Sequence, residues 1–326
     1  MIKVSVIVPV FNAGDRIYRC LDTLVNQTLK EIEIICVLDC PTDGTDRVVE
    51  QYASRDDRIV VVHNKRNLHI SGSRNEGLKI ARGDYIGFSD HDDFRDLRMY
   101  ELLYAKGKRE DSDIVVSDVW VKQEDGRVEV LRFEDMTKEG LVNSVILPYE
   151  SKQNKNQIGR SVWNNIYKSA FIRNKQIVFE DRRCYFEEDT LFNVKAFLYA
   201  SNISLVSEVF YHWDKHFDSE SNKAVSHKEA CKRQLHSLTY LTDLLFEENL
   251  FWDYKESFYI LASWYINMLF PVFRGLEGLD RTELVFLIKR SRFPLFGRYS
   301  LKKFSKKRLK LLLFVLNLKW DGIIKR

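Results

Sequence analysis

Short apolar runs alternate with amphipathic segments along the first hundred residues of the chain. Residues 4–10 form an apolar run, whereas residues 16–29 place their apolar side chains at the spacing of a helix. The alternation continues and predicts strands at residues 33–38, 58–62 and 85–89 and helices at residues 45–53 and 71–81. Apolar strands separated by helices are typical of a parallel sheet covered on both faces. The pattern therefore predicts an α/β fold with a mostly parallel central sheet.

The pattern is less regular beyond residue 96. The elements predicted there are a helix, a strand with its hairpin partner, a short ordered segment and a second helix, at residues 96–106, 113–121, 127–133, 163–167 and 189–198. Residues 150–160 are polar without apolar periodicity, which predicts a loop. From residue 227 onward the spacing is helical and rich in aromatic side chains. We therefore predict an α/β domain at residues 1–220 and a helical extension at residues 221–326.

Composition limits the class of protein. Of the 326 residues, 45% are hydrophobic and 13% aromatic, which is enough for a packed core. The five cysteines are odd in number and include no Cys-x-x-Cys pair, which disfavours a disulfide framework and favours a reducing, cytoplasmic location. The sequence opens in a strand-like run without the features of a signal peptide. No stretch reaches the ~20 apolar residues of a membrane span.

Charge is unevenly distributed along the chain. The net charge is +4, yet residues 281–326 hold 14 Lys and Arg against two acidic residues, so the rest of the chain is acidic. Within residues 301–326, basic side chains lie beside Leu, Phe and Trp, which is typical of a helix in a membrane interface. The alternative is a basic helix packed on the protein. We expect residues 301–326 to bind an anionic membrane surface, and we expect no nucleic-acid partner.

Polar segments follow three of the predicted strands, at residues 10–14, 39–45 and 90–93. Ligands of open parallel sheets bind beyond the carboxyl ends of the strands, which is where these segments lie. Asp90-His91-Asp92-Asp93 offers hard oxygen ligands of the kind that Mg²⁺ and Mn²⁺ prefer, and such ions also bind phosphate oxygens. The alternative is a solvated acidic turn in which Asp93 caps the next helix. His91 is expected to orient its neighbours or to face solvent.

Five segments in a fixed order resemble the family 2 glycosyltransferases of the GT-A fold, and together they span about residues 1–216. They are Val4 to Asn12, Asp39 with Thr42-Asp43-Gly44-Thr45, Ser73 to Gly77 followed by Ala81 to Ile86, Asp90-His91-Asp92-Asp93 as a DxD motif, and Glu188-Asp189 as an ED motif. The chain departs from the family at Leu38-Asp39-Cys40-Pro41, where paired acidic and then small residues are common.

The resemblance implies a role for each matched residue. The residues implied in donor binding are Pro9, Phe11, Asn12, Asp39, Arg74 and Asp90. Asp39 would accept a hydrogen bond from the nucleobase, and Arg74 would bind an anion near the start of a helix capped by Ser71. Mn²⁺ or Mg²⁺ would be bound by Asp92, with Asp93 in support. Asp189 would be the general base of an inverting transfer. The acceptor-side residues implied are Glu188, Trp163, Trp213 and His216.

Structural roles remain open for several of these residues. Asp39 is also suited to capping a turn, Arg74 to a surface salt bridge, and Asp189 to the acidic start of a helix. The two tryptophans are equally suited to a core.

The expected function is metal-dependent, inverting transfer of a sugar from a nucleotide sugar, with UDP favoured, to a glycan or lipid-linked acceptor in surface polysaccharide synthesis. The expected location is the cytoplasm, peripheral on the inner face of the cell membrane. Two alternatives are a sugar nucleotidyltransferase and a non-catalytic nucleotide-sugar or carbohydrate-binding module. The first needs a Gly-rich, basic phosphate loop, which residues 11–15 lack.

Overall fold

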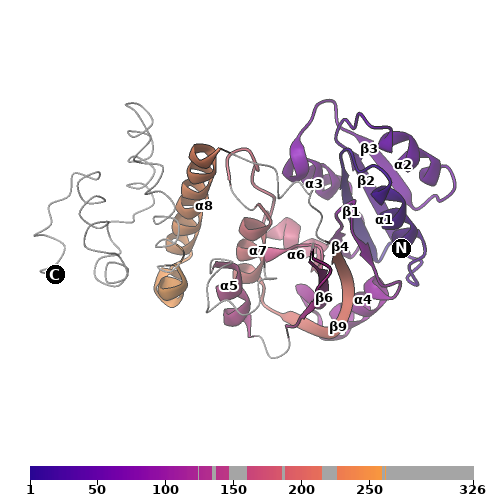
Figure 1. Cartoon of the computed structure of the whole chain (residues 1–326). Helices are drawn as coiled ribbons and strands as arrows, with labels where there is room; N and C mark the ends of the chain where they lie inside the picture. The colour runs from indigo at the N-terminus through magenta and orange to yellow at the C-terminus, as the bar shows by residue number, and fades with distance from the viewer. Residues whose placement is uncertain are drawn as a thin grey trace, which may run out of the picture. The chain divides into compact units, whose positions relative to one another are not determined.

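The computed structural model describes residues 1–123, 125–133, 137–146, 160–185, 188–214, 226–258 and 261. The chain divides into two compact units (Figure 1). The first comprises Met1–Val145, Asn156–Arg182 and Glu188–Lys223, and the second comprises Ile146–Lys155, Arg183–Glu187 and Ala224–Arg326. The predicted domain boundary at residue 220 and the predicted loop at residues 150–159 lie outside the described residues. No helix in the described part of the chain is long and apolar enough to cross a membrane.

One sheet in the first unit contains all the strands of the described residues. They are β1 (Val4–Val10), β2 (Ile32–Leu38), β3 (Ile59–His63), β4 (Tyr85–Phe88), β5 (Phe94–Arg95), β6 (Ile114–Lys122), β7 (Val128–Leu131), β8 (Asn165–Lys168) and β9 (Ile203–Asp214). Their order is β3-β2-β1-β4-β8-β6-β9-β5, with β7 paired to β6. The first four strands are parallel, as predicted, and β1 and β2 are buried along their whole length. The α/β fold is thereby confirmed.

The second half of the sheet reverses direction. Strand β8 runs antiparallel to both β4 and β6, whereas β6 and β9 run parallel to each other. The hairpin of β6 with β7 is present, as the sequence predicted. This mixed half carries Tyr211 and Trp163 to the carboxyl end of β4.

Helices of the first unit lie between its strands along the chain. They are α1 (Arg16–Val25), α2 (Thr45–Ala53), α3 (His69–Ile80), α4 (Met99–Glu110), α5 (Lys138–Ile146), α6 (Ser169–Asn174) and α7 (Glu188–Tyr199). Helix α5 extends one residue past the unit boundary. The second unit contains α8 (His227–Glu247), which confirms the first part of the helical pattern predicted from residue 227. The part of that prediction beyond residue 261 lies outside the described residues. Helix α1 ends four residues earlier than predicted, because Gln27 and Thr28 bond to the carbonyls of Asp96 and Leu97.

The start of α3 differs from the prediction in a way that matters for the site. The helix begins at His69, whose N–H is bonded to the side chain of Asn67 at 3.0 Å. The predicted cap, Ser71, lies inside the helix and accepts a hydrogen bond from the Arg182 N–H. The Ser71 cap is therefore wrong. Arg74 lies in the second turn of α3, away from the free N–H groups of the first turn.

Two glycines allow α3 and the segment after it to approach β1 closely. A Cβ on Gly77 would lie 2.5 Å from Ile7, and a Cβ on Gly83 would lie 2.6 Å from the backbone nitrogen of Ser5. Gly83 also donates its N–H to Ser5 Oγ at 2.7 Å. Because the contact at Gly83 is with backbone, a side chain there cannot be relieved by a change of rotamer.

We predict that Gly83→Ala destabilises the fold by about 1–3 kcal/mol, because the added methyl group forces the start of β1 to move. Denaturant unfolding would measure this difference. The matched control is Lys79→Ala on the exposed face of α3, for which the change should stay within about 0.5 kcal/mol. Equal stability of Gly83→Ala and the wild type would show that the contact is not tight.

Candidate active site

The loops that follow β1 and β2 are hydrogen-bonded to each other. Asn12 accepts a hydrogen bond from the Thr42 N–H at 2.7 Å, and Asp43 accepts one from the Gly14 N–H at 2.9 Å. Asn12 has φ of 46°, in the left-handed region that asparagine tolerates better than most residues. Of the predicted donor residues here, Phe11 is partly exposed and Asn12 exposed. The two loops therefore form one polar edge beyond the sheet.

Asp39 lies buried at the end of β2. Its Oδ1 accepts hydrogen bonds from the Leu68 N–H at 2.7 Å and from the Asn64 side chain at 2.8 Å. The carboxylate thus holds the turn that enters α3, which is the capping role left open above. Its Oδ2 receives no hydrogen bond from a described residue, so a nucleobase N–H can still bind there.

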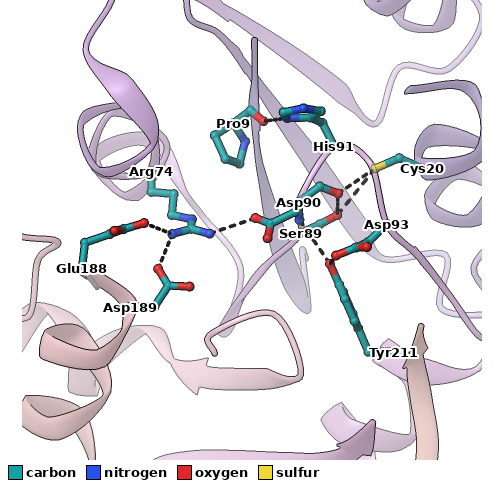
Figure 2. A network of polar contacts seen from close by, with 10 residues as sticks. All are labelled: Pro9, Cys20, Arg74, Ser89, Asp90, His91, Asp93, Glu188, Asp189 and Tyr211. Atoms are coloured by element: carbon teal, nitrogen blue, oxygen red, sulfur yellow. Dashed lines mark hydrogen bonds and ion pairs between the residues drawn. The ribbon is translucent and has the colours of Figure 1, made fainter. Parts of the chain in front are cut away.

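Arg74 is the centre of the site, and its side chain is 1% exposed (Figure 2). One terminal nitrogen, Nη2, donates to Asp90 Oδ1 at 2.8 Å, and Nη1 donates to Asp189 Oδ1. Nη1 also lies 3.6 Å from a carboxylate oxygen of Glu188. Asp90 follows β4, whereas Glu188 and Asp189 open α7. The guanidinium therefore joins the predicted DxD and ED motifs, and the surface salt bridge considered for Arg74 is wrong.

The segment after β4 is held from several sides. His91 Nδ1 lies 3.0 Å from the carbonyl oxygen of Pro9, which fits the orienting role expected for this histidine. The Tyr211 hydroxyl donates to Asp93 at 2.9 Å and accepts a hydrogen bond from the Asp90 N–H at 3.3 Å. Asp92 is partly exposed and forms no hydrogen bond or ion pair with any described residue.

The side chains of the segment Asp90-His91-Asp92-Asp93 differ in how well they could bind a metal ion. Asp93 is 3% exposed and bonded to Tyr211, and burial together with Asp92 and Asp90 raises its pKa well above the usual value. Asp92 has an accessible, unengaged carboxylate. The described residues contain no group of three or more His, Cys, Asp or Glu arranged around a metal position. The geometry thus fits an ion held by Asp92 and substrate oxygens, because Mg²⁺ commonly keeps only one or two protein carboxylates.

Residues 5–178, which are more than half of the chain, match the family described as glycosyl transferase family 2. The chain belongs to glycosyl transferase family 2. Membership confirms the resemblance drawn from the five sequence segments.

Curated relatives resemble more than half of this family 2 chain. The uncharacterized glycosyltransferase EpsJ of Bacillus subtilis is 34% identical over 64% of the chain, which spans 60% of EpsJ. The cholesterol galactosyltransferase of Borreliella burgdorferi is 30% identical over 76% of the chain and 69% of its own length. The poly(ribitol-phosphate) beta-glucosyltransferase of Bacillus spizizenii is 32% identical, and the chain spans 32% of it.

Solved structures support the fold. Staphylococcus aureus TarS 1–349 in complex with UDP-GlcNAc is 22% identical, with a TM-score of 0.61 over all of this chain and 93% of that one. The mannosyltransferase PcManGT of Pyrobaculum calidifontis, in complex with GDP-Man and Mn²⁺, is 14% identical, with a TM-score of 0.53 over 98% of this chain and 87% of that one. The predicted GT-A fold of this family 2 chain is thereby confirmed.

Aromatic rings line the side of the site formed by β9. Tyr211 stacks on Trp163 with ring centroids 4.1 Å apart, and Trp213 lies 5.8 Å from Trp163. Trp163 is 6% exposed, so the structure favours the core role left open for it, whereas Trp213 is partly exposed. His216 lies outside the described residues.

The sequence did not predict that Tyr211 and Arg95 hold the acidic segment after β4. Tyr211 holds Asp90 and Asp93, and the buried Arg95 packs beside it, with its guanidinium carbon 5.6 Å from the Tyr211 ring centre. The signal for Tyr211 is its register: it pairs with Arg95 across β5 and β9, so the two share the buried face of the sheet. Only knowledge of this pairing would have identified the contact.

Burial is the main influence on Asp189 of this family 2 site. It raises the pKa of Asp189 to about 7, with the negative charges of Glu188 and Asp90 adding to the effect and Arg74 opposing it. A carboxyl group with this pKa exchanges a proton near neutral pH, which suits a general base. The Asp189 side chain remains 21% exposed, so a substrate hydroxyl can reach it.

We predict that this titration appears in the stability of the protein. An unfolded aspartate loses its proton near pH ~3.9, so between that pH and about 7 the folded state binds more protons than the unfolded state. Stability should therefore fall as pH rises through this window, and Asp189→Asn should remove part of the fall. Thermal unfolding at pH 5 and pH 8 would measure it. An unchanged pH dependence in the variant would contradict the raised pKa.

Proposed function

We propose that this chain is an inverting glycosyltransferase that moves a sugar from a UDP-sugar to a hydroxyl group of a glycan or lipid-linked acceptor. One observation carries the proposal: Arg74 brings Asp90, from the predicted donor side, and Asp189, the predicted base, to a single guanidinium. The two carboxylates come from segments almost one hundred residues apart. A donor and an acceptor bound at the two segments would therefore meet.

The choice of donor and acceptor rests on the relatives. TarS was solved with UDP-GlcNAc, and other relatives are named as sugar transferases to poly(ribitol phosphate) or cholesterol. Asp39 supports a uracil base, because its Oδ2 is open to the N3–H of the ring. These names favour a UDP-sugar donor and a surface-polymer or lipid acceptor.

The reaction proposed is a single displacement. The acceptor oxygen forms a bond to the anomeric carbon while the bond between that carbon and the diphosphate oxygen breaks, and UDP leaves with the bonding electron pair. Asp189 takes the proton of the acceptor hydroxyl through Oδ2, the oxygen that Arg74 leaves open. Inversion at the anomeric carbon follows because no covalent enzyme intermediate intervenes.

Mn²⁺ or Mg²⁺ is the cofactor proposed, with Asp92 as its protein ligand. Such an ion supplies neutralisation of the charge that builds on the departing diphosphate. Asp93, first considered a supporting ligand, is assigned instead to holding the segment through Tyr211. Pro9, Phe11 and Asn12 are assigned to the nucleotide, and Trp213 to the acceptor.

We predict that Asp189→Asn lowers the rate of transfer by about 100- to 10,000-fold while leaving UDP affinity within about three-fold of the wild type, because the base acts only in the chemical step. The measurement is UDP release from UDP-GlcNAc, UDP-glucose and UDP-galactose, with and without acceptor and with and without Mn²⁺. Asp111→Asn is the control, since the Asp111 side chain is 87% exposed and pairs with Lys168. Transfer by Asp189→Asn at near wild-type rate would exclude this base.

The same assay separates the alternative functions. A sugar nucleotidyltransferase would form a nucleotide sugar from a sugar phosphate and a nucleoside triphosphate, and a binding module would bind UDP without releasing it from any donor. Asp92→Asn should release UDP at the same rate with and without Mn²⁺. The residual UDP release of Asp189→Asn should still increase when Mn²⁺ is added. This pair of results would support the two assignments separately.

We also propose that residues 301–326 bring the enzyme to the inner face of the membrane, where a lipid-linked acceptor resides. Their placement lies outside the described residues, so the proposal rests on charge and apolar content. Each basic residue near an anionic leaflet contributes about 1 kcal/mol.

We predict that deleting residues 301–326 reduces co-sedimentation with vesicles of phosphatidylglycerol and phosphatidylcholine, and that added salt reduces binding of the full chain in the same way. UDP binding by the shortened chain is the control for folding. Equal sedimentation of the two chains would contradict the membrane role.

A further inference from the structure

Arg74 engages two functional carboxylates in the same manner. It binds Asp90 through Oδ1 and Asp189 through Oδ1, each from a different terminal nitrogen. Neither Oδ2 atom receives a hydrogen bond from a described residue, and both side chains keep partial exposure, 26% for Asp90 and 21% for Asp189. Figure 2 shows the guanidinium with one terminal nitrogen directed at each of the two aspartates. Each carboxylate is thus anchored by one oxygen and open at the other.

A guanidinium is suited to this arrangement by its shape. Its five N–H groups lie in one rigid plane, so two carboxylates bound to its two terminal nitrogens are held at a defined separation. A lysine ammonium is a single point charge and would bring both carboxylates towards one atom. The separation between Asp90 and Asp189 therefore depends on the planar fork as well as on the positive charge.

The position of Arg74 itself is rigid. The arginine projects from the middle of α3, and the helix is locked to β1 by the close contact of Gly77 with Ile7. The ring of Phe179 lies under the guanidinium, with its centroid 5.1 Å from the central carbon. Burial opposes the charge of Arg74, but Asp189, Asp90 and Glu188 raise its pKa above the usual value, so it stays protonated.

From this geometry we infer that Arg74 is a positioning residue that sets the spacing between donor-side Asp90 and the base Asp189. The role rests on the proposed function, since it assigns Asp189 as the base. It differs from the donor-binding role expected from sequence, in which Arg74 would contact the anionic donor directly.

Arg74 also tunes the charge state of Asp189. The groups that face Asp189 are Arg74 on α3, Asp90 after β4, Glu188 on α7 and the Tyr167 hydroxyl on β8. Arg74 is the one cation among these described neighbours, and it lowers the pKa of Asp189 against the raising effect of burial and of the two carboxylates. Loss of the cation should therefore move the proton uptake of Asp189 to higher pH.

The test compares Arg74→Lys, which keeps the charge but removes the fork, with Arg74→Gln, which removes both. Arg82→Lys is the matched control, because Arg82 forms a two-nitrogen pair with Glu33 outside this site. Three quantities would be measured: UDP affinity by calorimetry with Mn²⁺, the pH profile of kcat for UDP release from the donor that the wild type uses best, and thermal unfolding from pH 5 to pH 9.

A positioning role predicts that Arg74→Lys keeps UDP affinity within about three-fold while kcat falls about 100-fold, since misplacement of a base by 1 Å has effects of this size. In an Asp189→Asn background, Arg74→Lys should lower the remaining rate by less than about three-fold, because it acts through Asp189. The acid limb of the kcat profile should move to higher pH in Arg74→Gln. Arg82→Lys should match the wild type in all three quantities.

Other results would overturn the inference. A large loss of UDP affinity in Arg74→Lys with kcat retained would make Arg74 a donor ligand, and independent effects of the Arg74 and Asp189 changes would exclude action through the base. If the wild type released no UDP from any donor, the proposed function would fail, but the inference would still be tested by unfolding. In Arg74→Gln the fall of stability with pH should extend above pH 7, and an unchanged profile would contradict it.

Discussion

A buried guanidinium constrains the whole first unit. Arg74 is 1% exposed, and a cation removed from water in this way requires anionic partners close by. Asp90, Glu188 and Asp189 supply them from the end of β4 and the start of α7. Separating these segments would leave buried charges unpaired, which would raise the free energy of the folded state. Helix α3, strand β4 and helix α7 must therefore adopt one relative arrangement, and that arrangement brings the carboxylates of the predicted DxD and ED motifs together.

The same interaction explains why the cluster suits proton transfer. Three carboxylates around one cation leave an excess of negative charge, and burial adds to the difficulty of ionising all of them. As a result, the pKa of Asp189 is raised to about 7, and the positive charge of Arg74 keeps it from rising further. Buried ion pairs are weak sources of stability, so the arrangement is better explained by specificity and chemistry than by strength of folding.

The elements predicted correctly are those that depend on the pattern of neighbouring residues. Strands β1 and β2 and helix α2 were found because apolar runs and helical spacing are properties of neighbouring residues. The features that the sequence did not predict depend on contacts between residues far apart in the chain. The start of α3 moved because Asn67 and Asp39 bind its first turn, and the antiparallel direction of β8 depends on pairing with β4 and β6.

The site shows the same division between local and distant information. The motifs predicted functional roles for Asp90, Asp189 and Arg74, but no local pattern reveals that the arginine lies between the two aspartates. The helix prediction placed Arg74 beside free N–H groups at a helix start, which favoured anion binding. Once the true start of α3 moves Arg74 into the second turn, its partners become the carboxylates.

The acidic segment after β4 is consequently held from two directions. Arg74 binds Asp90 from the side of α3, and Tyr211 binds Asp93 from β9, with its ring stacked on Trp163. Between these two anchored aspartates, Asp92 has no bond to a described residue. A carboxylate left unpaired on a segment that is otherwise fixed needs no rearrangement to receive a cation, so preorganisation lies in its neighbours and not in Asp92 itself. This explains why the spacing of the motif carries more information than the acidity of any single residue.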